Sequence, residues 1–151
     1  MTKTFPAIVL LIISGLAPVP SEAAESFAFD HVALSVADVE ASKDFYVTLF
    51  GMVNITDREP IEGVRWLSMQ GGGELHLLAV VEGEVITNQA VHLAVKTPDF
   101  DALMEKIVVM SVKYTTWLGE GSGVTERDDG TRQIYLQDPD GYWIEVIGLP
   151  N

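Results

Sequence analysis

Three histidines and one glutamate are the residues of this chain whose types and surroundings could do chemistry. His31, His76 and His92 are its only histidines, and each begins or lies within an apolar, strand-like stretch. Glu145 lies between an isoleucine and a valine, where burial of an unpaired carboxylate is costly. Imidazoles with one carboxylate form a ligand set that suits Zn, Ni, Co, Mn or Fe(II). The sequence therefore predicts that these four side chains bind one divalent metal ion as cofactor.

An internal repeat relates the four residues in pairs. The segment that begins at His31 matches the segment that begins at His92 at an offset of 61. The windows around His76 and Glu145 align at an offset of 69. A pseudo-two-fold axis between two such units would bring the four side chains together on the concave side of a sheet.

Each copy of the repeat predicts a strand, a helix and three further strands. Asp38 and Asp99 occupy the N-cap position of the two helices. Strand-like stretches follow each helix, at residues 52–56, 64–69 and 74–81 in the first copy and at 112–117, 131–137 and 142–147 in the second. The expected fold is α+β, with two βαβββ modules (about 27–82 and 89–149) forming a cup-shaped mixed sheet around the metal site.

The first 23 residues have the pattern of a secretory signal peptide. Lys3 precedes the apolar run 7–13, two prolines end the run, and small residues stand at 21 and 23. The run is shorter than the ~20 residues that a membrane-spanning helix needs. The mature protein is therefore expected to begin near Ala24, to form a single domain over 24–151, and to be periplasmic or secreted.

The amino-acid composition narrows the classes of binding partner and of chemistry that are expected for this protein. The net charge of −13 disfavours binding to nucleic acid and to anionic membranes. The chain has no cysteine, so disulfides cannot stabilise it and no thiol can act as a nucleophile. Stability must come from the core, from a metal or from a partner subunit.

The chain resembles the vicinal oxygen chelate superfamily, which includes glyoxalase I, bleomycin-resistance proteins and extradiol dioxygenases. The resemblance covers about residues 27–149, and its motifs lie at 30–36, 45–46, 50–51, 91–95 and 135–145. It implies paired modules around one divalent metal that binds two neighbouring oxygens of a small-molecule substrate. Relatives build the cup either within one chain or across a dimer, and open sheet edges favour a homodimer here.

Two enzymatic branches of that superfamily fit. In the glyoxalase I branch all four residues are ligands, Glu145 is the base, and the metal stabilises an enediolate-type intermediate. That branch usually carries Glu or Gln where this chain has His76.

The other branch is that of Fe(II) extradiol dioxygenases. There His31, His92 and Glu145 would form the iron-binding triad, and His76 would be an acid/base. Tyr135 would match a signature tyrosine, although the histidine that precedes it in that signature is absent from residues 126–128.

A third reading, from another class, is a metal-free small-molecule binding protein, although such relatives generally lack the ligands. We expect a glyoxalase-like lyase or isomerase, with Glu145, His76 and Tyr135 as its catalytic residues. The loop at 118–130 is expected to cover the cup mouth.

Overall fold

A computed structural model describes residues 28–56, 61–80, 83 and 85–150. The expected signal peptide, residues 1–23, lies outside the described residues. Within those ranges, no helix is long and apolar enough to cross a membrane.

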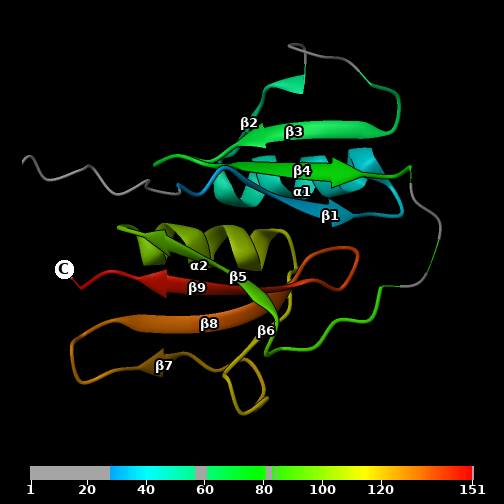
Figure 1. The fold of residues 1–151 in the computed structure, drawn as a ribbon. Coiled ribbons are helices and arrows are strands. Elements are labelled where there is room, and N and C mark those ends of the chain that lie inside the picture. The colour runs from blue at the N-terminus through cyan, green and yellow to red at the C-terminus, as the bar shows by residue number, and fades with distance from the viewer. Residues whose placement is uncertain (1–27, 57–60, 81–82, 84, 151) are drawn as a thin grey trace, which may run out of the picture.

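The first module contains one helix on a four-stranded sheet (Figure 1). The elements are β1 (His31–Ser35), α1 (Val39–Phe50), β2 (Val53–Asn54), β3 (Val64–Ser68) and β4 (Glu74–Leu78). The strand order is β1-β4-β3-β2, in which β1 and β4 are parallel and the other pairs antiparallel. The predicted cap is present, because the Asp38 side chain accepts the N–H groups of Glu40 and Ala41.

The second module repeats this arrangement. Its elements are β5 (His92–Thr97), α2 (Phe100–Val109), β6 (Tyr114–Thr115), β7 (Thr125–Glu126), β8 (Arg132–Gln137) and β9 (Trp143–Gly148). The strand order is β5-β9-β8-β6, and β7 pairs with β8. The α+β prediction and the two βαβββ modules are thus confirmed. The short strand β7 was not predicted, and it ties part of the 118–130 loop to β8.

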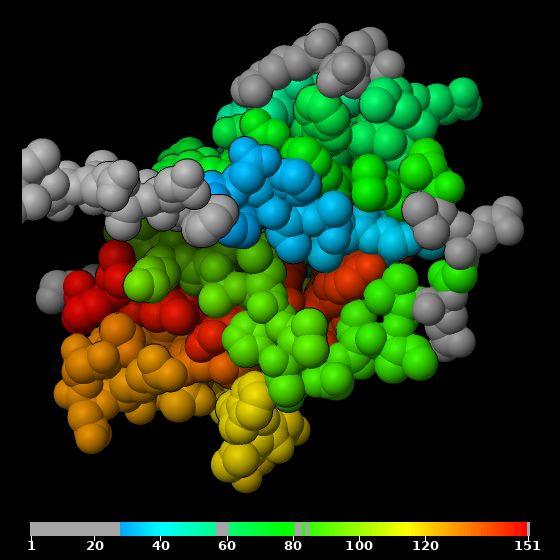
Figure 2. All heavy atoms as spheres, in the orientation of Figure 1, coloured from blue at the N-terminus to red at the C-terminus, as the bar shows by residue number. Residues whose placement is uncertain are grey.

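Successive side chains of a strand point to opposite faces of the sheet, and apolar side chains alternate with polar ones here, so each sheet has one apolar face. Side chains of one parity on β3, β4, β8 and β9 are almost completely buried and form a core shared with both helices, including Leu67, Leu75, Leu77, Ile134, Leu136, Ile144 and Val146. The core spans both modules, and the segment around β1 lies against the second module (Figure 2). The side chains of opposite parity, including all four predicted ligands, are on the other face of each sheet.

The turn between β8 and β9 joins the second module to α1 of the first. The Tyr46 hydroxyl donates to Asp138 Oδ2 at 2.8 Å. The Asp140 carboxylate accepts the Ala37 N–H and the Ser42 hydroxyl, each at 2.6 Å. Burial raises the pKa of Asp138, and burial followed by the nearby Asp138 charge raises the pKa of Tyr46. This turn is therefore also a polar contact between the modules.

Candidate functional site

His31 and His76 form one pair, on neighbouring parallel strands. Ala33 of β1 lies opposite His76 of β4, which places His31 on the same face. The two imidazole rings are stacked, with centroids 4.2 Å apart and an interplanar angle of 10°. The Trp66 ring from β3 stacks on His76 as well, at 4.9 Å. His76 is thus held between two flat neighbours and has little freedom to rotate.

A carboxylate orients each imidazole of this pair. His31 Nδ1 lies 2.7 Å from Asp30 Oδ2, and His76 Nε2 lies 3.0 Å from Glu74 Oε2. When each ring donates its N–H to that carboxylate, the remaining nitrogen keeps a lone pair. Carboxylates accept from metal-binding histidines in this way, which fixes the tautomer and raises ligand basicity. These two bonds would leave His31 Nε2 and His76 Nδ1 as the nitrogens available to a ligand.

His92 and Glu145 form the second pair, on β5 and β9. His92 Nε2 lies 3.0 Å from Glu145 Oε2, and His92 Nδ1 lies 2.8 Å from the backbone carbonyl of Gln89. A carbonyl only accepts, so Nδ1 carries the proton of that bond. A neutral His92 would then point a nitrogen lone pair at a carboxylate. Either a second proton or a cation between the two groups must offset this repulsion, and a divalent metal fits.

Polar and aromatic side chains enclose Glu145, which is 8% exposed. The Gln133 amide donates to Glu145 Oε1 and to the Tyr135 hydroxyl. The Tyr135 ring meets the His92 ring edge-on, with centroids 5.5 Å apart. Burial, and then the negative charge of Glu145, raises the pKa of Tyr135. Tyr135 therefore stays protonated and can donate to the carboxylate.

The two pairs do not meet within one chain. Nowhere in the described ranges are three or more His, Asp or Glu side chains close enough to hold a metal ion together. Figure 1 shows the reason, because β1 and β4 run in one direction whereas β5 and β9 run in the opposite one. His31 and His92 begin their strands and so lie at opposite ends of this arrangement. A single chain brings the residues together as pairs, and the four-ligand site stays a prediction.

Three supporting residues were not singled out from the sequence: Asp30, Glu74 and Gln133. For two of them, Glu74 and Gln133, the spacing in the sequence could have indicated the role. Glu74 precedes His76 by two positions and Gln133 precedes Tyr135 by two, so each shares a sheet face with its partner. Asp30 is adjacent to His31, and its contact depends on side-chain direction rather than on parity.

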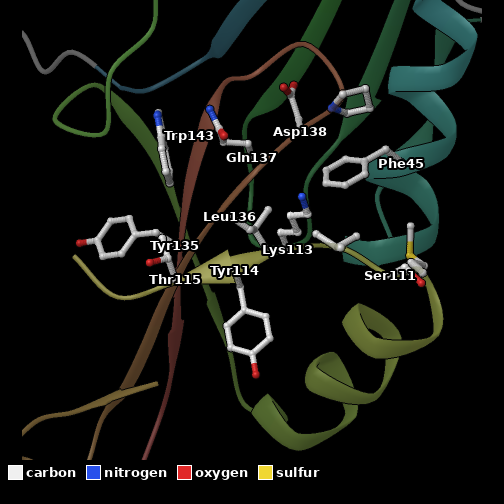
Figure 3. Close-up of a pocket in the computed structure, with 13 residues that line it drawn as sticks. Phe45, Ser111, Lys113, Tyr114, Thr115, Tyr135, Leu136, Gln137, Asp138 and Trp143 are labelled. Carbon is white, nitrogen blue, oxygen red and sulfur yellow. The ribbon is translucent and has the colours of Figure 1, made fainter. Parts of the chain in front are cut away.

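A pocket of about 460 Å³ borders Tyr135 on the side of β6 (Figure 3). Tyr135 and Trp143 contribute to its wall, together with Lys113 and with Phe45 from α1. His92 and Glu145 do not line it. Tyr135 therefore borders this pocket and also contacts the His92 ring.

Comparison with known proteins identifies the family. Residues 28–146 match the Glyoxalase/Bleomycin resistance protein/Dioxygenase superfamily. The chain is 25% identical to a lactoylglutathione lyase of Pseudomonas putida, over 89% of this chain and 92% of the relative. It is 30% identical to the uncharacterized protein YwbC of Bacillus subtilis (strain 168), over 78% and 94%.

Solved structures agree with this assignment. The fold matches a glyoxalase/dioxygenase from Nostoc punctiforme with a TM-score of 0.67 and 26% identity, over 91% of this chain and 99% of the other. It also matches oxidase ChaP-H2 with a TM-score of 0.68 and 22% identity, over 83% and 95%, a likeness of fold alone. The chain therefore belongs to the Glyoxalase/Bleomycin resistance protein/Dioxygenase superfamily.

Proposed function

We propose that this protein is a divalent-metal-dependent lyase or isomerase of the glyoxalase I type. The metal site is shared by two chains, with His31 and His76 from one subunit and His92 and Glu145 from the other. The observation that carries the proposal is the His92–Glu145 contact, in which an oriented imidazole nitrogen faces a buried carboxylate. That arrangement supplies two ligands to a divalent cation.

Sharing between chains follows from the placement of the pairs. Each pair is complete and oriented by its own hydrogen bonds, yet the described part of one chain gathers no larger ligand group. Among the described residues, β2 and β6 end their sheets on the sides away from β1 and β5, and each leaves one edge unpaired, which a homodimer would cover. A second copy of the chain is therefore the proposed source of the missing pair.

Glu145 is the proposed base for moving a proton at a carbon alpha to a carbonyl. Gln133 holds Glu145 Oε1, which leaves Oε2 to exchange its contact with His92 for the substrate proton. Gln133 also donates to the Tyr135 hydroxyl, and protonated Tyr135 can donate to the carboxylate in turn. A bound divalent ion would supply positive charge beside two neighbouring substrate oxygens.

One observation favours the second candidate, an Fe(II) dioxygenase. His76 Nε2 is held by Glu74, and this pairing suits an acid/base histidine. His31, His92 and Glu145 would then be the only protein ligands, as a facial triad requires. The two functions differ in the role of His76.

Metal-dependent assays separate the candidates. The metal-stripped protein is reloaded with Ni, Co, Mn or Zn and tested on the hemithioacetal of glutathione and methylglyoxal, and with Fe(II) on catechols under oxygen. We expect turnover of the hemithioacetal, loss of turnover in Glu145→Gln, and retention in Glu105→Gln, which changes an exposed residue of α2. Oxygen uptake with Fe(II) alone would establish the dioxygenase instead. A gently purified protein that binds no metal would rule out both enzymes and leave a binding protein.

A further inference from the structure

The two copies of the repeat differ in their hairpin turns. The turn 138–142 between β8 and β9 corresponds to the turn 69–73 between β3 and β4. In the second module, Asp140 and Tyr142 of this turn bind the segment that leads into α1, and Tyr142 donates to the Ser35 carbonyl at 2.9 Å. In the first module, Gly71 and Gly73 stand in the corresponding positions and bring no side chain to α2.

The glycine turn leaves a cavity of about 660 Å³ between the modules, here called the glycine-turn cavity. All three of its glycines have positive φ values, of 98°, 101° and 87°, which side chains rarely adopt. The walls are mostly apolar and come from both modules, and they include Phe50, Met52, Leu93, Val95 and Leu103. Leu103 stands where the first module has Ser42, the hydroxyl that binds Asp140.

Two cations line the glycine-turn cavity. Lys96 and Lys106 both contribute to its wall, and neither makes an ion pair with any other described residue. Asp99 also lines it, but its carboxylate accepts the Ala102 N–H and caps α2. Two uncommitted lysines beside an apolar cavity are notable in a chain of net charge −13. This combination complements a ligand with an apolar body and an anionic group.

We propose that the glycine-turn cavity binds a small amphipathic carboxylate, with its aliphatic part between the modules and its carboxylate beside Lys106 and Lys96. None of the four predicted metal ligands lines this cavity. Binding there therefore does not depend on the metal or on the proposed reaction. The site is distinct from the pocket beside Tyr135.

Decanoate and 1-decanol test the proposal, because they share an alkyl chain and differ in charge. Calorimetry on the full chain should show saturable decanoate binding, with decanol about tenfold weaker. Lys106→Gln should weaken decanoate binding about threefold, whereas Lys113→Gln, which removes a charge outside the cavity, should not. Ala102→Trp should block binding, and the same change at Ala41, the corresponding position of α1, should leave it intact.

Specific outcomes would overturn the proposal. Equal binding of decanoate and decanol would show that the lysines do not recognise the anion. If Lys106→Gln and Lys113→Gln weakened decanoate binding equally, the effect would come from the net charge of the protein and not from a contact in the cavity. The same measurements are made on a chain that starts at Ala24, the expected mature form, and saturable decanoate binding there also supports the proposal. Absence of saturable binding up to about 1 mM in both chains would leave no ligand of this class.

Discussion

At the level of single residues, hydrogen bonds decide which nitrogen of each histidine is left for a ligand. The Nδ1 of His31 is hydrogen-bonded to Asp30, and the Nδ1 of His92 is hydrogen-bonded to the Gln89 carbonyl. In both residues Nε2 is therefore the nitrogen that remains for a ligand. His76 is the exception, because Glu74 contacts its Nε2. The two imidazoles that both enzymatic candidates use as ligands are thus oriented alike, and the one that separates the candidates is oriented differently.

The contact between Glu74 and His76 leads to a prediction about metal affinity. Glu74→Gln should lower the affinity about tenfold, because a neutral amide raises the basicity of the imidazole less than a carboxylate does. Competition with a chelating dye measures this, and Glu105→Gln is the charge-matched control. Unchanged affinity in Glu74→Gln would mean that His76 is not a ligand.

The pKa of Tyr135 provides a second prediction. Burial and the Glu145 charge hold it above the ordinary value of 10.0, so Tyr135 should titrate later than an exposed tyrosine. Glu145→Gln removes a negative charge and should lower that pKa. Ultraviolet difference titration against Tyr135→Phe isolates the signal. An identical Tyr135 titration in both proteins would show that the two side chains do not interact.

The sequence identified His31, His76, His92, Glu145 and Tyr135 because their residue types are rare or costly in apolar strands. It did not identify the supporting side chains. Glu74 and Gln133 are polar residues near strand starts, which is where solvated residues are common. Their spacing of two from His76 and Tyr135 indicates the shared sheet face, and the pairing of β3, β4, β8 and β9 agrees with it.

At the level of elements, capping residues and apolar strand-like stretches determined most of what could be predicted. Asp38 and Asp99 begin the two helices as expected, since a side-chain oxygen there satisfies free N–H groups. Strand ends were less predictable. The stretch 52–56 forms only Val53–Asn54, and β7 exists because β8 offers it a partner. Short strands depend on such tertiary pairing more than on local sequence.

The contact between Tyr46 and Asp138 predicts a pH-dependent loss of stability. Tyr46→Phe leaves a buried carboxylate oxygen without its donor and should destabilise the protein by about 1–3 kcal/mol near neutral pH. The Tyr46 hydroxyl lowers the pKa of Asp138, so its removal raises that pKa further. The stability loss should therefore shrink as the pH falls and Asp138 takes up a proton.

Urea unfolding at several pH values measures this effect. Tyr114→Phe is the matched control, because the Tyr114 hydroxyl makes no hydrogen bond to a described residue and its removal should change little. A loss in Tyr46→Phe that grew toward acid would contradict the role assigned to Asp138.

At the level of the whole molecule, the sequence predicted one site of four residues, whereas the structure places them in two separate pairs, which the sequence did not predict. The offsets of the repeat relate the modules to each other, and they contain no information on how the two sheets face. In the described residues the modules share one core through α1, α2 and the 138–142 turn, and this packing leaves the metal pairs apart. Assembly with a second chain thus becomes part of the proposed site.

At the level of the whole molecule, we also propose that the protein is exported and loses its N-terminal signal peptide. Expression with the native N-terminus in a bacterial host should deliver a mature protein that begins near Ala24 to the periplasm. Intact-mass measurement of the periplasmic fraction checks the cut. Recovery of the full chain from the cytoplasm, with none in the periplasm, would contradict the signal-peptide prediction.

The most direct test of the shared metal site is a mixed dimer of two complementary variants. One chain carries His31→Ala and His76→Ala, the other carries His92→Ala and Glu145→Ala, and different tags allow the mixed dimer to be purified. One of the two shared sites then joins two intact pairs, and the other joins two damaged pairs. The account predicts about one tightly bound metal ion per mixed dimer, with about two in the unaltered dimer and none in either variant alone. A folded mixed dimer that binds no metal would contradict it, because a site built within one chain would be damaged in both subunits.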